Sequence, residues 1–161
     1  MRELAVWLQA SPLGTLMRDA GPWTYAFVNL AHIFGIAALF GAILILDLRL
    51  IGAWRRTPLA AIAAVASPVA ACGLALAATT GAGLLATRAT EYVGNPFLYV
   101  KLPVIAVGVA NAILLRRSGA WRALGSRDLS LGERRQLAWM GGTSLVCWLT
   151  AIAAGRLIAY W

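Results

Sequence analysis

Apolar residues gather in four long runs along this chain, at residues 23–46, 60–86, 96–115 and 137–159. A helix needs about 20 apolar residues to cross the roughly 30 Å of hydrocarbon in a bilayer, and each run reaches that length. Residues typical of helix boundaries precede the runs, at Gly21-Pro22, Arg55-Arg56, Asn95-Pro96 and Arg134-Arg135. The pattern therefore predicts an all-α, polytopic membrane protein, in which residues 1–161 form one antiparallel bundle of four transmembrane helices.

Residues 1–20 precede the first run and mix apolar with polar positions. Glu3 and Asp19 interrupt this segment, and the run that follows is longer than the apolar core of a signal peptide. The segment predicts a short interfacial helix on the outer leaflet, with a frayed tail as the alternative. Its apolar positions are Leu4, Trp7, Leu8, Leu13, Leu16 and Met17.

Composition agrees with a membrane protein. Apolar residues make up 61% of the chain and charged residues 12%, whereas about a quarter of the residues in a soluble domain are charged. The same hydrophobicity excludes a disordered chain, and two cysteines are too few for a disulfide scaffold. Cys72 and Cys147 fall near the middle of two apolar runs, so we expect both thiols to be reduced and to serve in helix packing.

The formal net charge is +8, which in a soluble protein would indicate nucleic-acid binding. Here most basic residues flank the connections after the first and third runs, and the positive-inside rule places such connections in the cytoplasm. We therefore expect a membrane protein with both termini outside the cytoplasm, in contact with lipid and not with nucleic acid. These basic residues are Arg49, Arg55, Arg56, Arg116, Arg117, Arg122, Arg127, Arg134 and Arg135.

Small residues predict where the helices approach each other, because association in lipid depends on close backbone contact. Gly73, Ala77 and Gly81 repeat at intervals of four and form one smooth stripe in the second run. On the other three helices, the small residues that would allow close approach of a neighbouring helix are Gly35, Gly41, Ala106, Ala110, Ala151 and Gly155.

Tyr25, Asn29 and His32 follow spacings of four and three, so they share one face of the first helix. Ionisable and amide side chains inside a membrane segment mark a functional site or an interhelical contact. In a structural interpretation, His32 donates a hydrogen bond to Thr79 or Thr80 on the second helix.

Two functional interpretations of His32 stay open beside the structural one. The imidazole is a suitable ligand for haem or copper, although the single histidine excludes a bis-histidine haem within one chain. Alternatively, His32 carries protons or binds a quinone together with Asn29, Tyr25 and Lys101.

Polar residues at the other end of the first helix predict a structural clamp. Asp47 and Arg49 are two residues apart and cannot lie side by side on a helix, so each needs another partner. For Asp47 we expect Asn111, Arg116 or Arg117 at the end of the third helix. The chain carries no metalloprotease or serine-hydrolase motif that would make this group catalytic.

Several motifs together resemble a known family. They are Trp23-Thr24-Tyr25, Ala31-His32-Ile33-Phe34-Gly35, Gly41, Asp47-Leu48-Arg49-Leu50-Ile51-Gly52, Asn95-Pro96-Phe97, Lys101 and Asn111. With these motifs, most of the chain resembles a family of uncharacterised bacterial four-helix inner-membrane proteins, which implies a location in the bacterial inner membrane and no particular activity. A more remote similarity, to the membrane domain of copper-resistance protein D, implies copper handling.

We therefore expect an integral membrane subunit of a larger complex, without catalytic activity of its own, that binds a haem, metal or quinone near His32. Its partners would be other membrane or periplasmic subunits or further copies of the chain. The alternatives are a transporter of copper or another ion, and a purely structural membrane anchor. An ion path is disfavoured by the apolar residues Ile36, Leu39 and Ile43, which separate the two polar ends of the first helix.

Overall fold

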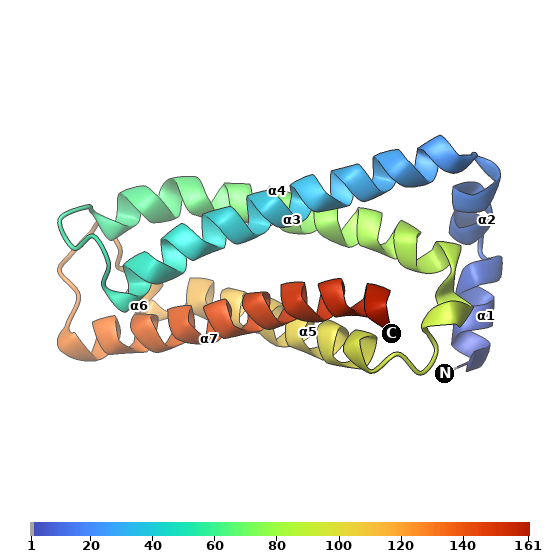
Figure 1. Ribbon diagram of the computed structural model, residues 1–161. Coiled ribbons are helices and arrows are strands. Elements are labelled where there is room, and N and C mark those ends of the chain that lie inside the picture. Colours follow the sequence, from blue (N-terminus) through green and yellow to red (C-terminus); the bar gives the residue numbers. More distant parts are fainter. Residues whose placement is uncertain (1) are drawn as a thin grey trace. The chain divides into compact units, whose positions relative to one another are not determined.

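The computed structural model describes residues 2–161 (Figure 1). The helices are α1 (Arg2–Ala10), α2 (Pro12–Asp19), α3 (Pro22–Ile51), α4 (Leu59–Thr87), η1 (Ala89–Tyr92), α5 (Pro96–Arg117), α6 (Gly119–Arg122), α7 (Leu131–Leu157) and η2 (Ile158–Tyr160). No strand occurs in residues 2–161. Helices α3, α4, α5 and α7 are long and apolar enough to cross a membrane. The predicted all-α, polytopic fold is thereby confirmed.

The chain divides into two compact units, and each of the helices α3 and α4 contributes to both. The first unit contains the described residues up to Leu39 together with Ala71–Asn95. The second unit contains Phe40–Ala70 and Pro96–Trp161. The two units are described separately below.

Two helix ends differ from the boundaries predicted by hydrophobicity. Helix α3 continues past the apolar run to Ile51, through Asp47 and Arg49. Helix α7 begins at Leu131 and not near residue 137, because Ser130 and Glu133 form a capping box. Each side chain accepts a hydrogen bond from the other residue's backbone N–H, which satisfies two donors that a helix start leaves unpaired.

The N-terminal segment of the first unit forms two short helices that are tied to the chain beyond α4. The side-chain oxygen of Gln9 accepts hydrogen bonds from the backbone N–H and the hydroxyl of Thr90, at 3.0 and 2.7 Å. Met17 is buried, with its sulfur against Gly83 of α4, so it does not belong to the exposed apolar surface that we predicted for it. Trp7 and Leu16 are exposed and stay available for the predicted interfacial contact, while Met1 lies outside the described residues.

The predicted small-residue stripe forms the contact between α3 and α4 in the first unit. Gly35 and Gly73 are both buried, and a Cβ atom on Gly73 would lie 2.8 Å from the carbonyl oxygen of Gly35. On the other side, a Cβ atom on Gly35 would lie 3.1 Å from the Cα atom of Ala77. The two backbones therefore touch directly, as helices in lipid do where small residues face each other.

Helices α5 and α7 lie side by side in the second unit (Figure 1). Gly108 is buried against the indole ring of Trp148, whereas Ala106 and Ala110 are exposed, so the predicted small-residue contact of α5 is shifted to Gly108. Gly41 likewise faces open space, contrary to the prediction. The apolar core of this unit consists of Leu46, Leu50, Ala63, Ala66, Leu115, Ala120 and Leu137.

Candidate functional site

The polar face predicted for α3 exists in the first unit, and its residues differ in exposure. Tyr25 and Asn29 are exposed, whereas His32 is half-buried. Asn29 lies seven residues after Pro22, the first residue of a helix that has 30 residues in all. If the middle of α3 lies at the bilayer centre, Asn29 is about 11 Å from that centre, within the hydrocarbon.

His32 makes the interhelical hydrogen bond that one of the three interpretations predicted. Its Nδ1 atom lies 3.0 Å from the hydroxyl oxygen of Thr80 on α4. The single hydroxyl proton of Thr80 is donated to the carbonyl of Leu76 at 2.5 Å. With its proton on the Leu76 carbonyl, the Thr80 oxygen accepts a hydrogen bond from Nδ1 of His32.

Thr79, the other predicted partner, is exposed and donates to carbonyls of its own helix. Gly81 provides the space for the imidazole, because a Cβ atom there would lie 2.9 Å from Cε1 of His32. The small-residue stripe of α4 thus ends at Gly81, which leaves space for the imidazole ring of His32. The sequence showed the glycine but not the side chain that it accommodates.

A metal site was a further interpretation of His32. Within residues 2–161, no group of three or more His, Cys, Asp or Glu residues is placed to hold a metal ion. Copper centres in proteins use several such ligands. His32 is therefore not part of a group of three such ligands in the described chain, and copper, haem or quinone binding there stays a prediction.

Lys101, predicted to join this face, belongs to the second unit. There its half-buried side chain lies over Gly155 of α7, with Nζ 3.0 Å from the position of a Cβ atom on that glycine. Arg156, the next residue on α7, donates a hydrogen bond to the hydroxyl of Tyr160 and stacks on its ring at 4.8 Å. Gly155 thus makes room for a long basic side chain, as Gly81 does for an imidazole.

Asp47 is the most deeply buried charged residue, at 2% exposed, and its partner differs from those predicted. Its carboxyl group interacts with the hydroxyl of Ser144, and its backbone lies against Gly141, both on α7. The carboxyl oxygen Oδ2 has no hydrogen-bond partner. The expected pairing with Asn111, Arg116 or Arg117 is not seen in the described part of the chain.

The other three clamp residues have separate roles. Asn111 donates to the carbonyl of Met140 at 2.9 Å, which ties α5 to α7. Arg49 donates to the carbonyls of Thr57 and Arg55, which closes the connection between α3 and α4. Arg116 is exposed at the end of α5. Asp47, Arg49 and Asn111 therefore make separate contacts, and the four residues do not form a single clamp.

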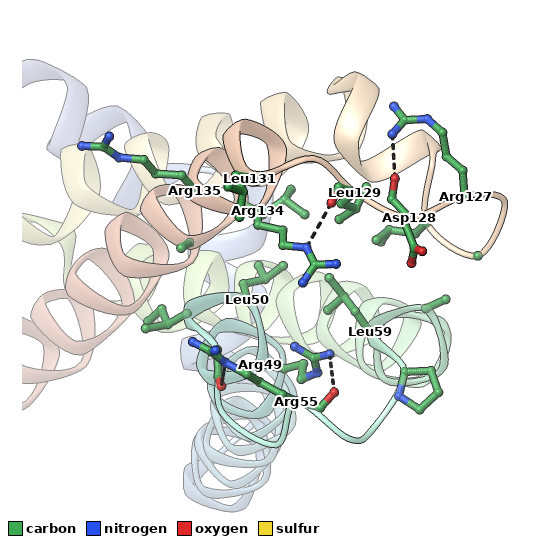
Figure 2. A pocket seen from close by; sticks show the side chains of 18 of the residues that line it. Arg49, Leu50, Arg55, Leu59, Arg127, Asp128, Leu129, Leu131, Arg134 and Arg135 are labelled. Carbon is green, nitrogen blue, oxygen red and sulfur yellow. Dashed lines mark hydrogen bonds between the residues drawn. The ribbon is translucent and has the colours of Figure 1, made fainter.

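A groove that the sequence did not predict opens in the second unit where α3 ends and where α4 and α7 begin (Figure 2). Its volume is about 830 Å³. The basic residues lining it are Arg49, Arg55, Arg127, Arg134 and Arg135, and we call it the arginine groove. Apart from Arg49, which we also assigned to the clamp, these arginines were interpreted only as markers of membrane orientation, because sequence spacing does not show that two distant connections meet.

One of these arginines is neutralised within the chain. Arg127 forms an ion pair with Glu133 through both terminal nitrogens. The hydrogen bond and the charge of Glu133 raise the pKa of Arg127, so this guanidinium stays protonated. Asp128 is the one acidic residue among those lining the groove, which therefore carries an excess of positive charge.

No protein-family model, curated protein or solved structure matches this chain. The class of protein therefore rests on the fold: four apolar helices of membrane-spanning length define a multi-pass, all-α membrane protein.

Proposed function

We propose that this chain is a non-catalytic membrane subunit, and that the polar face of α3 is where a helix of a partner subunit or of a second copy binds. The observation that carries the proposal is Asn29. Its amide is exposed on the side of a membrane-spanning helix and has no hydrogen-bond partner in the described chain. Amide side chains at this depth normally hydrogen-bond across a helix contact.

The placement of its neighbours supports the same face. Tyr25 is 39% exposed one turn earlier, and Ile33 is 55% exposed one turn later on the same face. The Nδ1 atom of His32, by contrast, is already hydrogen-bonded to Thr80 within the chain. A partner helix would therefore contact this face at Tyr25, Asn29 and Ile33, with Asn29 supplying the polar contact and Tyr25 and Ile33 supplying packing.

We place both termini outside the cytoplasm of a bacterial inner membrane. The support for this orientation is the concentration of arginines in the connections that follow α3 and α5. Alkaline phosphatase fused to the C-terminus would then be active in cells, and a green fluorescent protein fusion would be dark. The reverse pattern would refute the orientation.

The subunit proposal is tested by the size of the particle extracted in a mild detergent. An interhelical hydrogen bond of this kind contributes about 0.6–2 kcal/mol, so Asn29→Leu should weaken assembly roughly 3- to 30-fold. Native mass spectrometry of the wild type should show the 17.1 kDa chain bound to a partner or to itself, and Asn29→Leu should shift it toward the monomer.

Two variants serve as controls for this experiment. Asn29→Gln keeps the amide and should retain part of the assembly. Thr79→Val removes an exposed hydroxyl that is already bonded within α4, and it should leave assembly unchanged. A wild-type chain that is monomeric at every concentration, or an Asn29→Leu variant that assembles normally, would leave a membrane anchor as the function.

A further inference from the structure

The arginine groove has the size and position of a ligand site at the membrane surface. Its volume of about 830 Å³ falls in the range of 300–1,000 Å³ that is usual for ligand pockets. Arg49 is two residues from the end of α3, Leu59 is the first residue of α4, and Leu131 is the first of α7. Because three spanning helices end here, the groove lies at the level of the lipid headgroups.

Positive charge in the groove is largely unpaired. Within residues 2–161 the ion pairs are Arg88–Glu91 and Arg127–Glu133, so Arg49, Arg55 and Arg134 have no carboxylate within 4.0 Å. Figure 2 shows the guanidinium group of Arg134 pointing into the groove, toward the wall that carries Arg49, while Arg127 points away. The arrangement leaves cations facing each other across an open space, which an anion would stabilise.

Backbone carbonyls hold these guanidinium groups in place by one edge. Nε of Arg134 donates to the carbonyl of Leu129 at 3.1 Å, and Nε of Arg49 donates to that of Thr57 at 2.9 Å. Nε of Arg55 is similarly directed to the carbonyl of Gly52 at 3.4 Å. A guanidinium has five donors, and on Arg134 the four terminal N–H groups have no acceptor in the described chain. Fixed, planar donors of this kind match the oxygens of a phosphate group.

Apart from Ser126 and Asp128, the remaining side chains of the lining are apolar. Six of them are leucines: Leu50, Leu59, Leu124, Leu129, Leu131 and Leu137. Leu50 and Leu137 are buried members of the core, so the groove has a rigid apolar floor beneath an arginine rim. A free phosphate ion would use the rim alone, whereas a phospholipid would use both surfaces.

We propose that the arginine groove binds an anionic phospholipid, with its phosphate on Arg49 and Arg134 and its glycerol and upper acyl chains along the leucines. Basic pockets between transmembrane helices are a known type of site for anionic headgroups. The proposal requires only that the chain spans a membrane, and it does not depend on a partner at Asn29.

Native mass spectrometry in detergent, with phosphatidylglycerol or phosphatidylcholine added, tests the proposal. The wild type should bind phosphatidylglycerol at least tenfold more tightly than phosphatidylcholine. Its affinity for phosphatidylglycerol should fall as the salt concentration rises. Arg134→Gln should weaken phosphatidylglycerol binding about five- to tenfold, because each arginine near a membrane surface contributes about one kcal/mol. Arg134→Lys keeps the positive charge but loses the planar, forked donors of the guanidinium group. Its affinity for phosphatidylglycerol should therefore lie between those of the wild type and Arg134→Gln.

Arg122→Gln is the matched control. This arginine is exposed on α6, outside the groove lining, and its substitution changes the net charge by the same amount. It should bind phosphatidylglycerol as the wild type does. Equal losses in Arg122→Gln and Arg134→Gln would refute the groove as the site, since only overall charge would then matter.

Two further outcomes would overturn the proposal without relying on a variant. Equal retention of phosphatidylglycerol and phosphatidylcholine by the wild type would show that no anionic site exists. Displacement of the lipid by a few millimolar inorganic phosphate would show that the arginines serve a soluble phosphate ligand. If lipid binding survives phosphate and is lost only when Arg134 is changed, the lipid site is established.

Discussion

The direct contact between α3 and α4 predicts a large effect of one methyl group at Gly73. A Cβ atom there would lie 2.8 Å from the carbonyl oxygen of Gly35 and 2.9 Å from the Cα atom of Leu39. Both obstacles are backbone atoms, which cannot rotate away as a flexible side chain would. In Gly73→Ala the two helices must therefore separate by about 0.5–1 Å, a gap that forfeits a quarter to a half of the dispersion energy of each contact.

The magnitude follows from a comparison with Gly41→Ala. A Cβ atom on Gly41 would meet nothing within 4 Å, so this variant gains only the higher helix propensity of alanine, about 0.5–1 kcal/mol. Gly73→Ala has the same gain, which cancels in the difference between the two variants. What remains is the cost of overpacking, about 1–3 kcal/mol.

Thermal unfolding in detergent, followed by circular dichroism, measures this difference. We expect the Tm of Gly73→Ala to lie roughly 3–10 °C below that of Gly41→Ala, at about 2–4 °C per kcal/mol for a chain of this size. Equal Tm values would refute the reasoning, because α3 and α4 would then not be in backbone contact at Gly73.

Two more predictions concern buried polar groups. Ser144→Ala removes the hydroxyl that interacts with the buried carboxyl of Asp47, and should lower the free energy of unfolding by about 1–3 kcal/mol in the same assay. Thr143→Ala, at an exposed neighbouring position, should have little effect, and equal losses would contradict the Asp47 contact. Burial raises the pKa of Tyr92 above its usual 10.0, so the folded state holds this proton longer than the unfolded state does and stability should fall as the pH rises past 10. Tyr92→Phe should make that decline shallower, and an unchanged slope would show that Tyr92 does not contribute to it.

The four spanning helices were predictable from sequence because each apolar run exceeds the thickness of the hydrocarbon. Their ends were less predictable, since hydrophobicity does not determine where a helix stops. Ser130 and Glu133 carried a recognisable signal for the start of α7, three residues apart as a capping box requires. The continuation of α3 to Ile51 had no such signal, because Asp47 is buried by α7, which lies far away in the sequence.

Contacts within one pair of sequence-adjacent helices were predicted better than contacts with α7. The depth of Thr80 along α4 was enough to suggest it as a partner of His32, because adjacent antiparallel helices fix the depth of their residues. Periodicity also found Gly73 and Ala77. It could not decide between Gly108 and the flanking Ala106 and Ala110, because any face of an apolar helix carries suitable small residues and only the indole of Trp148 distinguishes them.

For the arginines, the sequence explained why these positions carry positive charge but not why the residue is arginine and not lysine. The positive-inside rule requires only charge near the membrane, and lysine would satisfy it as well as arginine. Yet Lys101 is the one lysine among the 14 basic residues of this chain. In the arginine groove, Nε of Arg134 is bonded to a backbone carbonyl while its terminal nitrogens have no acceptor in the described chain. Arg49 donates to two backbone carbonyls, through Nε and one terminal nitrogen, and an ammonium group cannot reproduce either arrangement. Membrane orientation therefore explains the charge at these positions, but a bound phosphate group explains the choice of arginine.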